Sequence, residues 1–347
     1  MRTTTPCLLL ALACLWPMQA AAQGSRTKAA VESPAGFAAR PEVREFAQQV
    51  AERRQLDAKW VLEQLSQARL QPGAQRLMMP PPPGTAKNWA AYRDRFVEPQ
   101  RIAAGQRFWQ DNAQWLERAE AKYGVPAEVV VGIVGVETFY GRVTGTFRVL
   151  DVLATLAFDF PAGRSDRSAF FRSELEEFLV LCQREELDAT QPKGSFAGAM
   201  GLPQFMPSSQ NKWAVDFDGD GRVDLLRSTP DVIGSVARFL AEHGWQRDMP
   251  ATFFVAPPVD TGARATLLQP DILPSFSAEQ MIGLGASLDD AGRAHTGLLA
   301  LVELQNGNAA PSFVAGTQNF YAVTRYNRSS YYAMAVLELG EAVRRSR

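Results

Sequence analysis

Residues 195–224 read SFAGAMGLPQFMPSSQNKWAVDFDGDGRVD, and this stretch joins two kinds of binding chemistry. Its first half is rich in glycine, alanine and methionine, and it carries Ser195 and Gln204 as polar side chains. Small residues there allow a large ligand to approach the backbone closely. Its second half places carboxylates at alternate positions around a glycine turn, which is the pattern of a loop that holds a hard cation. The stretch therefore predicts a ligand-binding loop that runs directly into a cation loop.

The cation loop matches an EF-hand loop at most of its ligand positions. With the first aspartate at position one, a glycine falls at position six and a backbone carbonyl at position seven. Position twelve, where a bidentate glutamate is expected, holds Arg227. The pattern favours a bound structural Ca²⁺ over the alternative, an acidic, solvated turn without metal. The ligands predicted at positions one, three, five, seven and nine are Asp216, Asp218, Asp220, the Arg222 carbonyl and Asp224.

A second informative stretch, residues 126–142, reads PAEVVVGIVGVETFYGR and predicts a buried helix from Pro126 to Gly141. Valine and isoleucine occupy nearly all of its faces, whereas Glu137 lies near its carboxyl end. Desolvation and the negative end of the helix dipole both oppose ionisation, so they raise the pKa of this carboxyl. Such a group can donate a proton at neutral pH, as the acid of a glycosidase does. The alternative is a structural glutamate neutralised by Arg142 or by a hydrogen bond at the helix end.

The sequence offers no evident second carboxylate for a two-acid mechanism. Asp151 and Asp159 are the nearest candidates, and both are more typical of helix caps or turns. Taken together, Glu137 and the two-part loop indicate an enzyme that acts on a polysaccharide.

Composition excludes several other classes of function. The 347 residues are 46% hydrophobic, which is enough for a large core and two or three subdomains. A formal net charge of -1 gives no sign of nucleic-acid binding. With only two histidines, a zinc site or a Ser-His-Asp triad is not expected. Cys182, the one cysteine outside the first 22 residues, has apolar helical neighbours and is expected to be a buried thiol.

The N-terminus has the features of a targeting segment. Arg2 is followed by the apolar run CLLLALACLW at residues 7–16 and by three alanines at residues 20–22. This pattern predicts a signal peptide over residues 1–22, cleavage near Ala22 and export to the periplasm. The alternative, an outer-membrane lipoprotein acylated at Cys14, fits less well, because Ala11 stands where a lipidation signal usually has leucine. The protein would therefore meet the membrane only if it were lipidated at Cys14.

Hydrophobic spacing predicts a mainly helical chain with one β-rich part. Apolar residues at three- and four-residue spacing predict helices within residues 41–72, 99–123, 168–186, 230–244 and 331–344. Between residues 252 and 323 the character changes to short β-like runs, FFVA, LLALVEL and FYAVT, separated by proline, asparagine and glycine. These runs predict a small β-rich subdomain before the final helix.

Four motifs closely resemble the lytic murein transglycosylase B family, in the same order and with near-matching spacing. They are VGIVGVETFYGR, SFAGAMGLPQFMPSS, AVDFDGDG and TRYNRSSYYAMAV, and the resemblance runs from about Trp89 to the C-terminus. The family implies an α+β, mainly α fold with a lysozyme-like catalytic core that carries an EF-hand-type loop. The expected division is a signal peptide 1–22, a flexible segment 23–40, a helical domain 41–110, a catalytic core 111–251 with its loop at 216–231, a β-rich subdomain 252–323 and a segment 324–347 that returns to the core.

The resemblance also implies a reaction and a partner. The family cleaves the β-1,4 bond between N-acetylmuramic acid and N-acetylglucosamine in peptidoglycan and leaves a 1,6-anhydromuramoyl end. One glutamate acts as acid and then as base while the acetamido group of the substrate stabilises the anomeric centre, and no catalytic cofactor is needed. Glu137 matches that glutamate. The expected partners are peptidoglycan strands and, beyond them, cell-wall synthesis complexes.

Individual site residues follow from the family motifs, position by position. Ser195 matches a serine that hydrogen-bonds the catalytic carboxyl, and Gln204 matches a glutamine that contacts the sugar. Asp231 takes the place of the last acidic ligand of the cation loop. In the loop PAGRSDRSAFF at residues 161–171, Arg167 aligns best with an arginine pair of the family. The remaining matches to the substrate cleft are Tyr92, Phe205, Tyr326, Asn327 and Tyr332.

Two other functions stay open at the level of sequence. A hydrolytic muramidase would cut the same bond and leave a reducing end. A non-catalytic protein of the cell wall would bind glycan without cutting it, although the intact glutamate motif argues against this.

Overall fold

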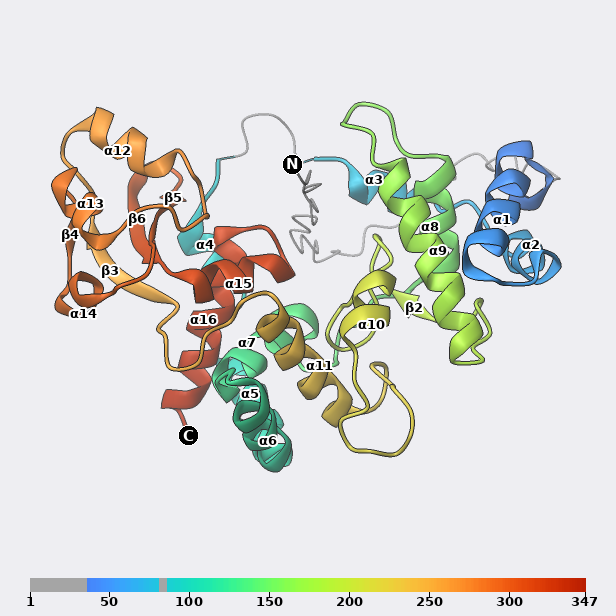
Figure 1. Cartoon of the computed structure of the whole chain (residues 1–347), viewed down its shortest axis with the longest axis horizontal. Helices are drawn as coiled ribbons and strands as arrows, with labels where there is room; N and C mark the ends of the chain where they lie inside the picture. The colour runs from blue at the N-terminus through green and yellow to red at the C-terminus, as the bar shows by residue number, and fades with distance from the viewer. Residues whose placement is uncertain (1–35, 81–85) are drawn as a thin grey trace, which may run out of the picture.

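The computed structural model describes residues 36–80 and 86–347, and this part of the chain is mainly helical with two small antiparallel sheets (Figure 1). This confirms the predicted α+β, mainly α class. The predicted signal peptide 1–22 and most of the predicted segment 23–40 lie outside the described residues. Within the described part of the chain, no helix has the length and apolar character that crossing a bilayer requires.

The first helical group combines the beginning of the chain with two helices from its middle. An apolar cluster joins Val50 and Leu65 to Leu153 and Phe178. Figure 1 shows α8 and α9 standing between helices α1 and α2 and the centre of the molecule. The elements of this group are η1 (Phe37–Ala39), α1 (Pro41–Arg54), α2 (Ala58–Ser66), α3 (Pro72–Met78), α8 (Val149–Phe158) and α9 (Ser168–Arg184).

The second helical group surrounds the nearly all-apolar helix that carries Glu137. Its apolar cluster includes Trp89, Phe108, Val130, Val236 and Val336. The elements are α4 (Trp89–Arg93), α5 (Pro99–Asp111), α6 (Ala113–Tyr123), α7 (Ala127–Thr138), α11 (Thr229–Glu242), α15 (Gln318–Tyr326) and α16 (Ser330–Arg345). Helix α10 (Pro207–Trp213) packs mainly on α9 and connects this group to the first.

These clusters divide the chain differently from the predicted domains. Helices α4 and α5 belong to the predicted helical domain 41–110, yet Trp89 and Phe108 pack in the same cluster as α7. Helices α8 and α9 belong to the predicted core 111–251, yet they pack on α1 to α3. The reason is long-range burial of aromatic and aliphatic faces, which the order of helices along the chain does not reveal.

The β-rich part is a four-stranded antiparallel sheet covered by short helices. The strand order is β4-β3-β6-β5, and Leu301 and Phe253 both pair with Ala315 on the central strand. The strands are β3 (Thr252–Ala256), β4 (Ser287–Leu288), β5 (Ala300–Asn306) and β6 (Ala309–Gly316), and the helices are α12 (Thr261–Leu268), α13 (Ala278–Gly283) and α14 (Asp290–Ala294). A separate two-stranded pairing joins β1 (Phe147–Arg148) to β2 (Lys193–Gly194).

Two predicted elements are corrected by the structure. The run FYAVT, expected as a strand, lies in helix α15, because Thr317 caps the helix through a bond from the Asn319 amide and Phe320 and Val323 share one buried face. The helix predicted to end at Gly141 ends at Thr138 instead. Phe139 and Tyr140 follow it with φ angles of 52° and 57°, a left-handed conformation that ends the helical hydrogen-bond pattern.

Helices α7 and α16 pack closely together, and glycines make this contact possible. A Cβ atom on Gly132 would lie 2.2 Å from the carbonyl oxygen of Val336, and one on Gly340 would lie 2.1 Å from that of Glu128. The two helix backbones therefore touch directly at both positions. This contact fixes how α16 lies relative to Glu137.

The substitution Gly132→Ala should lower the free energy of unfolding by about 1–3 kcal/mol, because the added methyl group overlaps a backbone oxygen that cannot move without shifting α16. Denaturant unfolding measures the effect. The control is Gly283→Ala at the end of α13, where a Cβ atom would meet nothing within 4 Å. Equal stability of the two variants would show that the backbone contact is not tight.

Candidate functional site

Glu137 lies in the last turn of α7 and is held by a tyrosine from α16. The Tyr332 hydroxyl donates a hydrogen bond of 2.6 Å to Oε1 of Glu137. Tyr332 itself is only 1% exposed, so the donor is fixed by the surrounding core. The sequence placed Tyr332 on the cleft wall, but a direct bond to the glutamate depends on the distant pairing of α7 with α16.

Burial gives this carboxyl an unusual proton affinity. Desolvation raises the pKa of Glu137 to about 7, and the hydrogen bond from Tyr332 opposes that rise by favouring the charged form. Arg142 does not neutralise Glu137, as its guanidinium lies over the Phe139 ring, 4.7 Å from the ring centre. Among the described residues, no ion pair reaches Glu137. At neutral pH the group is therefore divided between its acid and its carboxylate form.

The two aspartates considered as partners of Glu137 are engaged elsewhere. Asp151 accepts a hydrogen bond of 2.9 Å from the Arg69 amide and lies 3.5 Å from the Arg148 guanidinium. Asp159 forms an ion pair with Arg40. Both therefore tie α8 to the N-terminal part of the chain, and neither is available as a second catalytic carboxyl.

Thr138 connects Glu137 to the glycine- and methionine-rich loop. Its hydroxyl donates to the Leu202 carbonyl at 2.9 Å and accepts from the Gly141 amide at 3.1 Å. The sequence analysis missed this residue. Its position next to Glu137 was the available signal, but its partner 64 residues away was not evident from the sequence.

The loop itself places its two polar side chains differently from each other. The Ser195 hydroxyl accepts bonds from the amides of Ala197 at 3.3 Å and Ala199 at 3.1 Å, and among the described residues it forms no hydrogen bond to Glu137. Gln204 has a φ of 51°, and its side-chain amide donates to the carbonyls of Thr144 and Gly201. These bonds fix the loop in one conformation, with the Gln204 side-chain oxygen left as an acceptor.

The aromatic residues near Glu137 form a stack beneath the site. The rings of Tyr326 and Tyr332 stack at 6.3 Å with an angle of 15°, and the Tyr326 hydroxyl donates to the Pro203 carbonyl at 2.6 Å. Phe205 is 2% exposed, and its ring contacts those of Phe239 and Tyr326. The expectation that Phe205 lines the cleft is thus corrected, because its ring is part of the core that supports Tyr326.

Two further predicted residues lie toward the β-rich part. Tyr92 is 9% exposed on α4, and its ring meets that of Tyr331 edge to face. It lines a hollow of about 810 Å³ together with Arg95, Ser329 and residues of β5. Asn327 is buried directly after α15. The structure places Tyr92 next to Tyr331.

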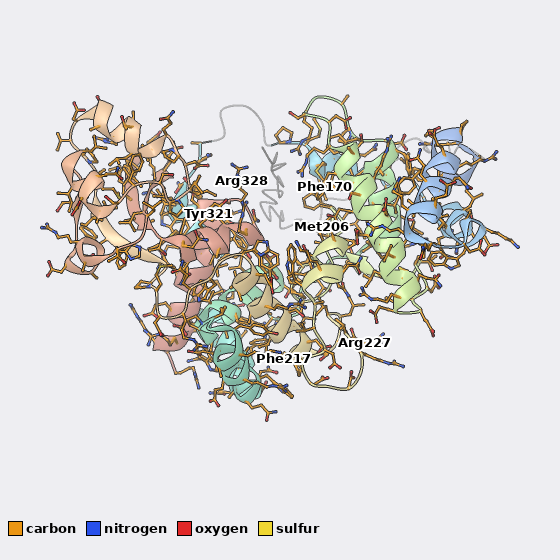
Figure 2. All side chains as sticks on the ribbon, in the orientation of Figure 1. Phe170, Met206, Phe217, Arg227, Tyr321 and Arg328 are labelled. Atoms are coloured by element: carbon orange, nitrogen blue, oxygen red, sulfur yellow. The ribbon has the colours of Figure 1, made fainter. Side chains whose placement is uncertain are left out.

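The loop at residues 161–171 faces the centre of the molecule from α9. The Arg167 guanidinium lies 4.8 Å from the centre of the Phe170 ring, and Arg164 donates to the Met78 carbonyl. Figure 2 shows Phe170 at the inner edge of this helical group and Arg328 across from it, before α16. Desolvation and the charge of Arg164 lower the pKa of Arg167.

The cation loop brings three of its predicted ligands together. Carboxylate oxygens of Asp216, Asp218 and Asp231 all lie within 4.8 Å of one another. Burial and the charges of the other two carboxylates raise the pKa of Asp231, which is the repulsion that a divalent cation relieves. Oxygen donors on a turn with Gly219 and Gly221 at positive φ suit Ca²⁺.

The other two predicted carboxylates, those of Asp220 and Asp224, are not part of this group. The Asp220 carboxylate accepts from the Arg222 amide, and that of Asp224 accepts from the amides of Leu226 and Arg227. Figure 2 labels Phe217 and Arg227 on the two arms of this loop. Asp220 and Asp224 thus cap local turns of the loop, and their role as further ligands, together with that of the Arg222 carbonyl, stays a prediction.

Ser228 is a contributor to the loop that the sequence analysis missed. It caps α11 by accepting from the Asp231 amide, and its hydroxyl donates to Asp218 at 3.0 Å. The signal was the serine before Thr229-Pro230-Asp231, which is typical of a helix N-terminus.

The raised pKa of Glu137 has a consequence for stability. Its folded-state pKa of about 7 exceeds the ordinary value of 4.5, so its contribution to stability is present at low pH and is lost as the pH rises through 7. The amide of the Glu137→Gln variant does not ionise, so the variant does not lose this stability as the pH rises. The difference in unfolding free energy, variant minus wild type, should therefore increase between about pH 5 and about pH 9. Its expected size is about 1.4 kcal/mol for each unit by which the folded-state pKa exceeds the ordinary value. Denaturant unfolding at both pH values measures it, and a stability difference that does not change with pH would contradict the raised pKa.

Comparisons with known proteins agree on one family. A family model described as "Transglycosylase SLT domain" matches residues 38–341. The relative "Membrane-bound lytic murein transglycosylase B" of Escherichia coli (strain K12) is 38% identical over 315 residues, which cover 88% of this chain and 84% of the relative.

Solved structures give the same result. The soluble lytic transglycosylase SltB1 from Pseudomonas aeruginosa is 37% identical with a TM-score of 0.80, over 88% of this chain and 99% of its own. The Escherichia coli lytic transglycosylase Slt35, solved in complex with calcium, is 37% identical with a TM-score of 0.77, over 90% of this chain and 96% of its own.

Proposed function

The chain belongs to the transglycosylase SLT domain family, and on that premise we propose that it cleaves peptidoglycan with Glu137 as its single acid and base. Its fold is that of the lysozyme-like lytic transglycosylases. The reaction breaks the β-1,4 bond between N-acetylmuramic acid and N-acetylglucosamine and forms a 1,6-anhydromuramoyl end. The observation that supports this assignment of Glu137 is the lone, desolvated carboxyl with a pKa of about 7 and a fixed tyrosine donor.

Each proton transfer needs a different form of Glu137. Protonated Glu137 donates to the oxygen that leaves the anomeric carbon, while the acetamido group of the substrate stabilises that carbon. The carboxylate then takes the proton of the C6 hydroxyl, whose oxygen closes the anhydro ring. A pKa near neutrality lets one group perform both steps without a large energetic penalty in either direction.

Tyr332 prepares Glu137 for this exchange. Its hydroxyl donates to Oε1, so we assign Oε2 of Glu137 as the atom that exchanges the proton with the substrate. As a donor, it stabilises the carboxylate that forms after the first transfer. Tyr326 stays a neutral hydroxyl, because burial and the charge of Glu137 raise its pKa well above 10.

Substrate binding is assigned to the side chains around this carboxyl. Gln204 offers its side-chain oxygen to a sugar hydroxyl or amide, since its nitrogen is bound to backbone carbonyls. Ser195 retains its hydroxyl proton as a donor, because the bonds that it makes in the loop are accepted ones. Tyr92, Tyr326 and Asn327 extend the surface toward the sheet, whereas Phe205 supports it from the core.

The two alternatives make different demands on the site. A muramidase of the two-carboxylate type needs a second group to activate water, and Asp151 and Asp159, the aspartates nearest in sequence, are both engaged elsewhere. A non-catalytic wall protein gains nothing from burying a carboxyl at a free-energy cost. Both considerations favour the transglycosylase.

The proposal also includes a bound Ca²⁺ and export of the protein. We assign the cluster of Asp216, Asp218 and Asp231 to a structural Ca²⁺ that holds the loop after the glycine-rich stretch. Asp220, Asp224 and the Arg222 carbonyl would complete its shell when the ion binds. The signal-like N-terminus supports export to the periplasm, where the glycan strands lie, and docking to wall-synthesis complexes there would follow.

Digestion of purified peptidoglycan tests the reaction and its catalyst together. The wild type should release muropeptides with 1,6-anhydro ends, one water lighter than hydrolysed ends, and Glu137→Gln should release none, because the amide cannot exchange the proton. Mass spectrometry of the products gives the answer. Reducing ends from the wild type would identify a hydrolase, and equal products from both proteins would remove Glu137 from the mechanism.

A chelator experiment tests the cation. Saturating Ca²⁺ should raise the melting temperature of the wild type, since a ligand that binds only the folded state stabilises it. Asp216→Asn should abolish this rise, whereas Asp290→Asn, at an exposed aspartate of α14, should keep it. Thermal unfolding with Ca²⁺ and with chelator measures both, and a calcium effect that survives Asp216→Asn would place the ion elsewhere.

A further inference from the structure

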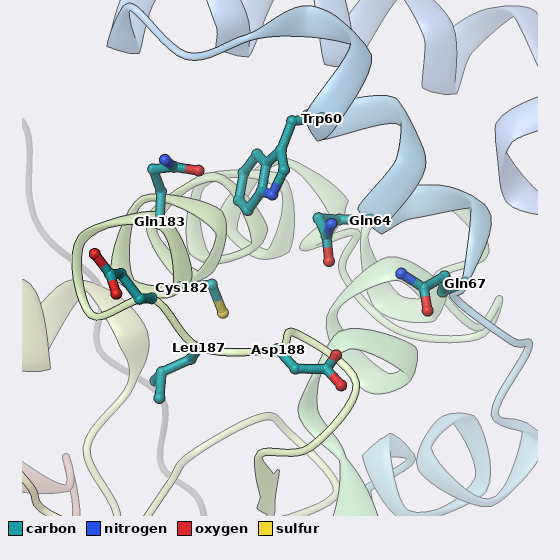
Figure 3. Close-up of a pocket in the computed structure, with 8 residues that line it drawn as sticks. Trp60, Gln64, Gln67, Cys182, Gln183, Leu187 and Asp188 are labelled. Atoms are coloured by element: carbon teal, nitrogen blue, oxygen red, sulfur yellow. The ribbon is translucent and has the colours of Figure 1, made fainter.

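We infer that the hollow between α2 and the end of α9 is a second glycan-binding site, separate from the catalytic carboxyl. It has a volume of about 480 Å³ and shares no lining residue with the site around Glu137 (Figure 3). Figure 1 shows α2 at the end of the molecule opposite the sheet. The inference rests on the proposed function for the identity of the glycan, an N-acetylated sugar strand.

Trp60 provides the aromatic surface of this hollow. Its indole is half-buried, and Figure 3 shows it projecting over the hollow from α2. Among the tryptophans in residues 36–80 and 86–347, Trp60 is the one whose indole has no contact with another aromatic ring or with a cationic side chain and forms no hydrogen bond. The indole packs in part against the apolar cluster of the first helical group, and it also lines the hollow. An indole in this position is suited to a pyranose ring, which presents C–H groups to an aromatic face and hydroxyls at its edge.

Amide side chains surround the indole and supply the polar contacts. Gln64 and Gln67 reach the hollow from the N-terminal helices, and Gln183 reaches it from α9. Within the described residues, none of these three side chains forms a hydrogen bond. Each amide offers two donors and an acceptor, which matches the hydroxyl and acetamido groups of an N-acetylhexosamine.

The charged side chains that line the hollow favour a neutral sugar over an anionic one. Glu186 and Asp188 line the hollow, and no lysine or arginine does, so an anionic ligand would be repelled. Their carboxylates accept hydrogen bonds from sugar hydroxyls. The floor includes Cys182, whose thiol stays protonated because burial raises its pKa to about 12. It therefore behaves as a small apolar surface.

The wall formed after α9 is held rigidly. The Leu187 amide donates to the Cys182 carbonyl at 2.8 Å, and Asp188 accepts from the Thr190 amide and hydroxyl. A site that is already ordered loses little entropy on binding. Two separate contacts with one long strand would also raise the local concentration of glycan at the catalytic site.

Nuclear magnetic resonance of the indole N–H groups tests the site directly. The probe is the tetramer of N-acetylglucosamine, added to Glu137→Gln so that the probe is not cut, and Trp60→Phe assigns the Trp60 signal by its loss. We expect the Trp60 N–H signal to shift in a saturable way. If other signals shift to saturation while the Trp60 N–H signal does not shift, the tetramer binds only in the catalytic site and the inference is wrong.

Sedimentation with insoluble peptidoglycan gives the second measurement. Trp60→Ala should weaken binding to peptidoglycan by about tenfold and leave kcat/KM for a soluble tetrasaccharide unchanged. Leu298→Ala, at an exposed leucine, is the control and should bind as the wild type does. Unchanged binding of Trp60→Ala would overturn the inference. Both readouts measure binding, so they remain informative even if product analysis rejects the proposed reaction.

Discussion

The contact between α7 and α16 is the constraint on which the rest of the site depends. Gly132 and Gly340 let the two backbones touch, and this closeness brings the Tyr332 hydroxyl within 2.6 Å of Glu137. The apolar faces of α7 then remove water from the carboxyl and raise its pKa to about 7. Packing, and not a charged partner, therefore sets the proton affinity that the chemistry needs.

The surrounding loops attach to this helix pair and to each other. Thr138 holds the glycine-rich loop to the end of α7, and the Tyr326 hydroxyl binds that loop at Pro203 from the other side. The same loop leads through α10 to the cation loop, where Asp231 on α11 accepts from the Phe217 and Asp224 amides. A cation at the cluster would stiffen a segment that ends close to the substrate-binding side chains.

Local patterns in the sequence predicted the chemistry better than the packing. The apolar faces of residues 126–138 indicated a buried glutamate, and alternate aspartates indicated the cation loop. The run FYAVT is predicted as a strand because a run of five mostly apolar residues is too short to distinguish a strand from a buried helix. The burial of Phe205, the bond from Tyr332 to Glu137 and the grouping of α8 with α1 all depend on contacts between distant parts of the chain. The periodicity of one segment contains no information about them.

The central claim is that one desolvated carboxyl, held near neutrality, performs both proton transfers. The most direct measurement is a pH titration of the ¹³C carboxyl signal of Glu137 in the intact protein, with Glu137→Gln used to assign the signal by its absence. The account predicts a midpoint at about pH 7. A midpoint near the ordinary value of 4.5 would contradict it, since the group would then be ionised at neutral pH and unable to act as the acid.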